Sequence, residues 1–281
     1  MNKDKIKQLS ITATKVRKHT IEAVYNAAAG HPGGSLSIAD ILSVLYHEVM
    51  KVDPKNPKNE DRDRFVLSKG HCSPALYGIL AEKGFFPVEE IKKFRQIDSY
   101  LQGHPDMKSV PGVDMSTGSL GQGICAANGM ALAAKLDKKD FRVYAILGDG
   151  ELQEGQVWEA AMFASHYKLD NLTAFVDFNG LQIDGNVEDV MNPSPIDEKF
   201  KAFGWNVLVI DAHDYDQILD AINKAKETKG KPTMIVAKSI KGKGVSFMEN
   251  QAGWHGSAPN KEQYEKAMEE LNATLAKLEV E

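Results

Sequence analysis

Cysteine is scarce in this 281-residue chain, and the two cysteines lie far apart. Cys72 and Cys125 have none of the spacings typical of a cysteine-ligated metal site. We therefore expect two buried, reduced thiols that behave as small hydrophobic groups.

Long apolar runs and an excess of positive charge are also missing. No stretch reaches the roughly 18 apolar residues that span a bilayer. The opening MNKDKIKQLS lacks the apolar region of a signal peptide. The formal net charge is −5, whereas nucleic-acid-binding proteins favour a basic face. These absences predict a cytoplasmic protein that binds neither membrane nor nucleic acid.

Helical patterns dominate the first half of the chain. The first 30 residues carry apolar positions at helical spacing and predict a helix that ends at Gly30. A second helix is expected to begin with Ser37 as its N-cap and to end near Met50. The pattern then predicts one strand followed by three helices, at 65–67, 73–83, 88–96 and about 120–136.

Strands and helices alternate in the second half. Apolar runs predict strands at 143–147, 172–178, 207–210 and 234–237, and amphipathic stretches predict helices at 152–167, from Tyr215 and at about 260–279. This alternation is typical of a parallel sheet covered by helices on both faces. We therefore predict an α/β fold, in a single domain over residues 1–281 with N-terminal helices within 1–50 and a C-terminal helix at 260–279.

Polar residues follow two of the predicted strands. Gly148–Asp149–Gly150 ends one strand, and Asn179 follows the next, 30 residues after Asp149. A right-handed βαβ unit of that length would bring both side chains to the carboxyl edge of the sheet, where α/β proteins bind ligands. A carboxylate and an amide oxygen suit Mg²⁺, and the Gly150 N–H suits an anion. The pattern favours a Mg²⁺-bound diphosphate, with a simple turn as the alternative.

Longer motifs in the same order then identify a family. GDGELQEGQVWEA at 148–160, followed by DFNGLQIDG at 177–185, resembles the thiamine-diphosphate signature in its transketolase form. Five other stretches agree: GHPGGSLSIAD at 30–40, LSKGHCSPALY at 67–77, QGHP at 102–105, STGSLGQGICAANGMA at 116–131 and WHGSAP at 254–259. The resemblance covers nearly the whole chain and implies the diphosphate-binding (PP-type) domain of a transketolase.

The resemblance also implies a role for each matching position. Asp149, Asn179 and the Leu181 carbonyl would bind Mg²⁺, which Ca²⁺ or Mn²⁺ can replace. Thiamine diphosphate would contact nine residues: His71, Gly118, Ser119, Leu120, Gly150, Glu154, Asn179, Ile183 and His255. Many full-length transketolases have proline at the position of Ser119, which leaves the contacts of that loop open. The catalytic residues would be His31, His104 and His255, which line the substrate channel of the family.

The chemistry of the cofactor explains why histidines are needed. Thiamine diphosphate attacks a ketose carbonyl as an ylid and stores the resulting carbanion itself. The protein has to move protons at sugar hydroxyls and stabilise developing oxyanions, and imidazoles suit both tasks. The resemblance thus implies transfer of a two-carbon ketol unit from a ketose phosphate to an aldose phosphate, as in the pentose phosphate pathway.

A complete transketolase is more than twice as long as this chain. The glutamate that activates the aminopyrimidine and the arginines that bind the sugar phosphate belong to the part that is missing here. The resemblance therefore implies a second polypeptide with the pyrimidine-binding and C-terminal domains. We expect an α₂β₂ heterotetramer that is active only when both chains are present.

Several alternatives stay open at this point. A deoxyxylulose-phosphate synthase lacks the LQEG continuation after GDG, and the α chain of a 2-oxoacid dehydrogenase lacks the GHPGG and QGHP motifs. A specialised ketol transferase fits the motifs, because the arginines that would set its specificity lie elsewhere. A non-catalytic cofactor-binding module is the other alternative, and the intact set of Asp149, Asn179 and the four motif histidines argues against it. GSLGQG at 118–123 has its glycines as GxxGxG, which argues against a dinucleotide site.

Two other features have a structural interpretation. The basic run Lys238–Lys243 could contact phosphate, but a solvated loop is the expectation. Four histidines fall outside the motifs and are expected to be structural: His19, His47, His166 and His213.

Overall fold

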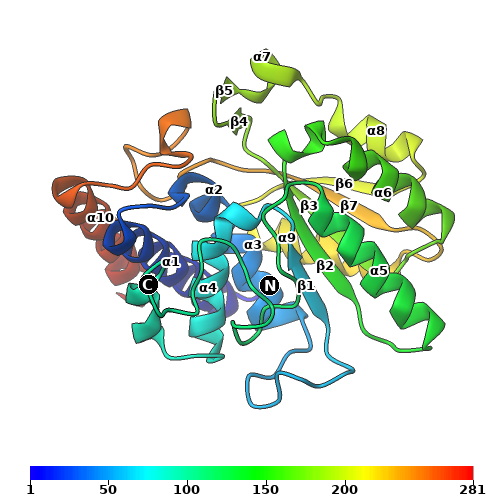
Figure 1. The fold of residues 1–281 in the computed structure, drawn as a ribbon, viewed down its shortest axis with the longest axis horizontal. Helices are drawn as coiled ribbons and strands as arrows, with labels where there is room; N and C mark the ends of the chain where they lie inside the picture. The colour runs from blue at the N-terminus through cyan, green and yellow to red at the C-terminus, as the bar shows by residue number, and fades with distance from the viewer. Residues whose placement is uncertain (281) are drawn as a thin grey trace.

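A five-stranded parallel sheet forms the centre of the protein (Figure 1). The computed structural model describes residues 1–280, so the predicted domain boundary at 281 lies outside the described residues. All neighbouring strands of this sheet pair in parallel. Their spatial order is β1 (Arg64–Leu67), β2 (Val143–Gly148), β3 (Leu172–Phe178), β7 (Thr233–Lys238) and β6 (Asn206–Asp211).

Helices cover both faces of the sheet (Figure 1). Successive strand residues point to opposite faces. Phe65 and Leu67 of β1 accordingly join a different core cluster from Val66. One face packs against α1 (Lys3–Ala27), α3 (Ala39–Val44), α4 (Ser73–Lys83) and α9 (Tyr215–Glu227). The other packs against α5 (Gln122–Leu136), α6 (Gly155–His166) and α8 (Ile196–Ala202). The predicted α/β fold class is confirmed.

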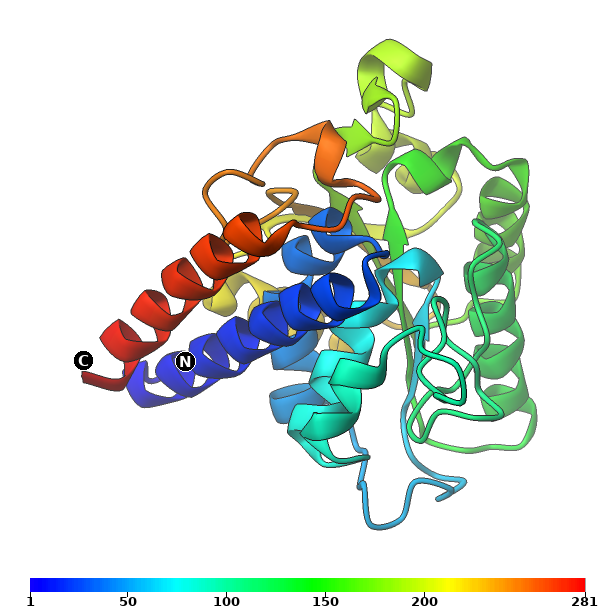
Figure 2. The same cartoon turned by 60° about the vertical axis from the view of Figure 1, so that its left-hand side comes forward.

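The remaining elements lie around this core. The long α10 (Lys261–Val280) packs along α1, as Figure 2 shows, and the Tyr25 and Tyr264 rings stack with centroids 4.1 Å apart. A small antiparallel hairpin, β4 (Leu181–Gln182) with β5 (Gly185–Asn186), leads into α7 (Val187–Met191). No helix within residues 1–280 combines the length and the apolar character that crossing a bilayer requires.

The prediction that Ser37 caps a second helix is wrong. That helical region begins earlier, as α2 (Pro32–Ser37), because proline fits the first turn of a helix, where its missing N–H is not needed. It continues as α3 and a π-helical turn at Leu45–Val49. The Ser37 hydroxyl donates to the Gly34 carbonyl and to Asp177, so it caps nothing.

Two smaller predictions also need correction. Residues 88–96 form only a 3-10 turn at Val88–Lys93, instead of an α-helix. Cys72 is buried as expected, but Cys125 is exposed because it lies on the side of α5 that faces away from the sheet.

Candidate functional site

A cavity of about 300 Å³ opens at the carboxyl ends of β2 and β3. Its walls come from these strand ends, the hairpin β4–β5 and the loop after β7. Nine of the predicted site residues line it: His71, Leu120, Asp149, Gly150, Glu154, Asn179, Leu181, Ile183 and His255. The structure thus gathers at one edge of the sheet residues that are more than 180 positions apart in sequence.

The ends of β2 and β3 are connected through the Asp149 carboxylate. Asp149 follows β2 directly, and its two oxygens accept the N–H groups of Gly150 at 2.8 Å and of Gly180 at 2.6 Å. Asn179 follows β3, and its amide oxygen accepts the Leu181 N–H at 3.1 Å. Because the strands pair in parallel, with Gly148 opposite Asp177, the two polar loops lie side by side as the βαβ spacing predicts.

The surroundings of Asp149 disfavour an isolated negative charge. Its side chain is only 2% exposed. Burial, together with the nearby negative charge of Asp177, raises its pKa to about 6, against the effect of the two backbone N–H groups. A positive ion beside Asp149 would offset both the desolvation and the repulsion between the two carboxylates.

The donors at this edge are oxygen atoms of three kinds. Within residues 1–280, no group of three or more His, Cys, Asp or Glu side chains is arranged to hold a metal ion. Among the residues that line the cavity, the loops after β2 and β3 bring together the Asp149 carboxylate, the Asn179 amide oxygen and the Leu181 carbonyl. The oxygens of Glu151, which also lines the cavity, already accept from Ser68, Gly121 and Gly148. Such a hard oxygen set fits Mg²⁺, which completes its octahedron with water and phosphate oxygens.

A buried ion pair, which the motifs did not indicate, lies beside these donors. The Lys69 ammonium donates to Asp177 at 2.5 Å and to the Gly34 carbonyl at 2.9 Å. Burial alone would lower the pKa of Lys69 and raise that of Asp177. The attraction between the two charges outweighs burial, so the pKa of Lys69 is raised and that of Asp177 is lowered. One feature of the sequence could have indicated this ion pair: Asp177 lies inside the apolar run of β3. A buried charge needs a partner of opposite charge.

Lys241 contradicts the prediction of a solvated loop at Lys238–Lys243. Its side chain is 2% exposed and lines the cavity. The Lys241 ammonium donates to the Leu181 carbonyl at 2.9 Å and lies 3.0 Å from Nδ1 of His255. Burial, with repulsion from Lys69, lowers its pKa to about 8. No sequence pattern distinguishes this lysine from its exposed neighbour Lys238.

Four histidines from four separate loops gather next to the cavity. The ring centroid of His31 lies 5.2 Å from that of His71, 5.5 Å from that of His255 and 6.4 Å from that of His104. His71 and His255 stack at 5.1 Å. These are the four histidines that the motifs singled out, and the structure brings them into one cluster.

The histidine cluster is neutral at pH 7. Burial, assisted by the positive charge of Arg95, lowers the pKa of His31 to about 4. Burial and the Lys241 ammonium lower the pKa of His255 to about 3. Burial also lowers the pKa of His71 and of His104. A neutral imidazole both donates and accepts a hydrogen bond, which is what proton exchange with a hydroxyl group requires.

Stability should therefore depend on pH through this cluster. Between about pH 6.5 and pH 4, His31 is protonated in the unfolded chain but stays neutral in the folded one. The free energy of unfolding should therefore decrease as the pH is lowered through this interval. Each such histidine adds at most about 1.4 kcal/mol per pH unit to the slope, and less where water screens it. Urea denaturation at a series of pH values measures this slope. His31→Gln should reduce it, and His166→Gln, on an exposed side chain, is the control. An unchanged slope in His31→Gln would contradict the explanation.

The loop Gly118–Ser119–Leu120 passes close to the histidines. Gly118 has a φ of +144°, and a Cβ there would lie 2.7 Å from Cδ2 of His104, so the position requires glycine. Ser119 is exposed in a neighbouring depression, whereas Leu120 reaches the cavity itself.

The rim of the cavity is exposed. Ile183, at the tip of the hairpin β4–β5, is 66% exposed, which is unusual for so large an apolar side chain. Glu154, just before α6, is exposed as well. The cavity therefore combines a polar floor with an open, partly apolar rim.

Comparisons with known proteins agree with the motifs. Residues 7–278 match the family described as "Transketolase, thiamine diphosphate binding domain". The chain is 48% identical over 259 residues to the 6-deoxy-6-sulfo-D-fructose transketolase subunit SqwG of Clostridium sp. (strain MSTE9), covering 92% of this chain and 94% of that protein. It is 44% identical over 276 residues to an apulose-4-phosphate transketolase subunit of Phocaeicola vulgatus, covering 98% of each chain.

Longer proteins match over part of their length. Human transketolase is 41% identical over 282 residues, which cover 98% of this chain and 44% of the human protein. The crystal structure of transketolase from Campylobacter jejuni superposes with a TM-score of 0.88 at 35% identity, covering 99% of this chain and 46% of that one. The chain spans almost all of the two subunits, yet less than half of these longer proteins.

Proposed function

This chain belongs to the transketolase family, as its thiamine diphosphate binding domain, and on that premise we propose that it is the N-terminal subunit of a two-subunit transketolase. One observation carries the proposal: the chain covers 98% of a protein that is named as one subunit of a transketolase, but only 44% of human transketolase. Such an enzyme is a transferase. The relatives' names favour a transketolase over the other thiamine diphosphate enzymes that the motifs left open.

The floor of the cavity would hold the metal and the diphosphate. Asp149, Asn179 and the Leu181 carbonyl would bind Mg²⁺, and Ca²⁺ or Mn²⁺ could replace it. The Leu181 carbonyl has a second lone pair besides the one that accepts from Lys241. Lys241 supplies positive charge on the same side of the cavity, which supports an anionic ligand.

The remaining proposed contacts surround this floor. The Gly150 N–H, Asn179, His71 and His255 would contact the diphosphate. Gly118, Ser119, Leu120 and Ile183 would lie along the cofactor rings, and Glu154 would lie at the contact between two active sites. When bound, thiamine diphosphate supplies the ylid and stores the carbanion.

The histidine cluster would act on the sugar. His31, His104 and His255 are neutral, so imidazoles of this cluster can exchange protons with substrate hydroxyls. In His255, Nδ1 faces the Lys241 ammonium, so Nε2 carries the proton and would donate. The Nδ1 of His31 is buried without a hydrogen-bond partner among the described residues, so no contact there fixes which ring nitrogen carries the proton.

A second chain would complete the site. We propose that it carries the pyrimidine-binding and C-terminal domains, in an α₂β₂ heterotetramer in the cytoplasm. The two relatives are named for a sulfonated ketose and for apulose 4-phosphate. We propose a ketose with a phosphate or sulfonate group as the donor, with pentose phosphates as the first to test.

The test is ketol transfer from xylulose 5-phosphate to ribose 5-phosphate. The chain is assayed with Mg²⁺ and thiamine diphosphate, alone and then mixed with a candidate partner that carries the pyrimidine-binding and C-terminal domains. We expect turnover only in the mixture, because in this proposal the second chain supplies the groups that activate the aminopyrimidine. The sulfonated ketose and apulose 4-phosphate extend the assay if xylulose 5-phosphate is inert. Full activity of the chain alone, or no activity of the mixture with any donor, would contradict the proposal.

A further inference from the structure

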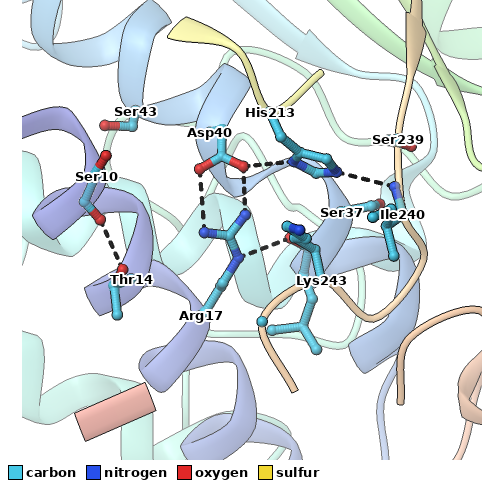
Figure 3. A network of polar contacts seen from close by, with 12 residues as sticks. Ser10, Thr14, Arg17, Ser37, Asp40, Ser43, His213, Ser239, Ile240 and Lys243 are labelled. Carbon is cyan, nitrogen blue, oxygen red and sulfur yellow. Dashed lines mark hydrogen bonds and ion pairs between the residues drawn. The ribbon is translucent and has the colours of Figure 1, made fainter. Parts of the chain in front are cut away.

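A polar network lies beside Ser239 and Ile240, which follow β7 and directly precede Lys241 (Figure 3). The Arg17 guanidinium, from α1, donates to both carboxylate oxygens of Asp40 in α3, at 3.2 and 2.5 Å. His213, between β6 and α9, contacts the same carboxylate through Nδ1 at 2.7 Å. The Tyr215 hydroxyl also donates to Asp40, at 2.6 Å. None of these side chains belongs to the site described above.

The hydrogen bonds of His213 determine which of its nitrogens carries the proton. Its Nε2 lies 3.0 Å from the backbone nitrogen of Ile240. A backbone N–H can only donate, so Nε2 accepts and the proton is on Nδ1, which donates to Asp40. Burial would raise the pKa of Asp40, but Arg17 and His213 outweigh it and hold that pKa below its ordinary value. The carboxylate is therefore charged and fixes the orientation of the imidazole.

Ile240 begins the loop that carries Lys241. On one side of it, the Ser239 hydroxyl donates to Asp177. On the other, the Gly242 N–H donates to the Gly33 carbonyl at 2.9 Å, in the segment that follows His31. Because the Lys241 side chain is buried, its ammonium can reach Leu181 and His255 only if the backbone beside it is held in place.

We propose that His213 is a positioning residue for the cavity: by accepting the Ile240 N–H, it fixes the loop at 239–244 and so places the Lys241 ammonium at the Leu181 carbonyl. Arg17 and Asp40 hold the imidazole in the orientation that this requires. From the sequence alone, His213 is expected to be merely structural. In the structure, His213 accepts the N–H of Ile240, the residue directly before Lys241, which lines the cavity. This contact gives His213 the specific role of positioning Lys241. The effect on cofactor rests on the proposed function, whereas the position of the loop does not.

Two substitutions distinguish the hydrogen bond made by Nε2 of His213 from the one made by Nδ1. In His213→Gln, the amide oxygen can reach the place of Nε2 and still accept from Ile240. In His213→Asn, the shorter amide reaches only the place of Nδ1, so it can donate to Asp40 but leaves the Ile240 N–H without its partner. Both variants are neutral and polar, and thermal unfolding checks that both are folded.

The first readout is hydrogen exchange of the peptide 239–246 in the full chain, which requires neither cofactor nor partner. We expect exchange in His213→Asn to be about 5- to 30-fold faster than in wild type, which at about 1.4 kcal/mol per tenfold corresponds to the loss of one hydrogen bond worth about 1–2 kcal/mol. His213→Gln should exchange at the wild-type rate. The second readout is acetylation of Lys241 by acetic anhydride, with the exposed Lys238 as internal reference. Lys241 should react faster in the Asn variant only.

The outcomes are distinct. Wild-type exchange and wild-type Lys241 acetylation in His213→Asn would overturn the proposal. Equal changes in both variants would also overturn it, because they would show a general structural role. Failure of the wild-type mixture to bind Mg²⁺ and thiamine diphosphate would overturn the proposed function but leave the exchange result to decide the role of His213.

Discussion

Replacing Asp149 with Asn should abolish ketol transfer by the mixed subunits and weaken Mg²⁺-dependent binding of thiamine diphosphate by at least about 100-fold. Asp149 is the only carboxylate among the three proposed metal ligands, and Asn has nearly the same shape without the charge. Calorimetric titration of the mixture with the cofactor in Mg²⁺ measures the affinity, and the xylulose 5-phosphate assay measures turnover.

The Asp149→Asn chain should remain folded. Burial and Asp177 raise the pKa of Asp149 to about 6, so removing its charge relieves repulsion in the empty cavity. The matched control is Asp220→Asn on α9, where the carboxylate is exposed and pairs with Lys224 one turn away. The control should bind and turn over as wild type does. A fully active Asp149→Asn enzyme would remove the basis for the metal site. A wild-type mixture whose two chains associate but show no activity would favour a non-catalytic module.

Replacing Lys69 with Met should lower the free energy of unfolding by about 3–5 kcal/mol, because it leaves the Asp177 carboxylate buried without its cation. Lys69 and Asp177 are 2% and 0% exposed, so water cannot compensate for the loss. Urea denaturation of the chain measures the change.

Two variants control this experiment. Lys238→Met makes the same substitution at an exposed lysine three residues before Lys241 and should cost under about 1 kcal/mol. Lys69→Met combined with Asp177→Asn removes both charges and should recover part of the lost stability. A loss under about 1 kcal/mol in Lys69→Met alone would show that the pair contributes little.

The sequence predicts the sheet well because its strands are buried. Apolar runs such as Leu172–Phe178 are continuous when both faces of a strand are covered, and this run matches β3 residue for residue. The side-by-side placement of Asp149 and Asn179 was also predictable, since it follows from the length of one βαβ unit. Local apolar patterns and the length of one βαβ unit are therefore enough to predict the strands and the placement of these two residues.

Contacts between distant segments could not be predicted in the same way. His213 and Asp40 are 173 residues apart, and no local pattern indicates that they meet. The burial of Lys241 depends in the same way on Leu181 and His255, which are contributed by other loops. For Ser37, by contrast, a local pattern predicted a role that the structure does not show. Serine is common at helix N-caps, but the Ser37 hydroxyl donates to the buried Asp177 carboxylate.

The decisive experiment is to locate the metal. Crystals of the chain with its partner, grown with Mn²⁺ and thiamine diphosphate, allow manganese to be placed by its anomalous scattering. We predict a peak in contact with the Asp149 carboxylate, the Asn179 amide oxygen and the Leu181 carbonyl, with the diphosphate in the same cavity. Manganese bound elsewhere, or a diphosphate outside this cavity, would contradict the proposal that this chain holds the cofactor's diphosphate through a metal ion.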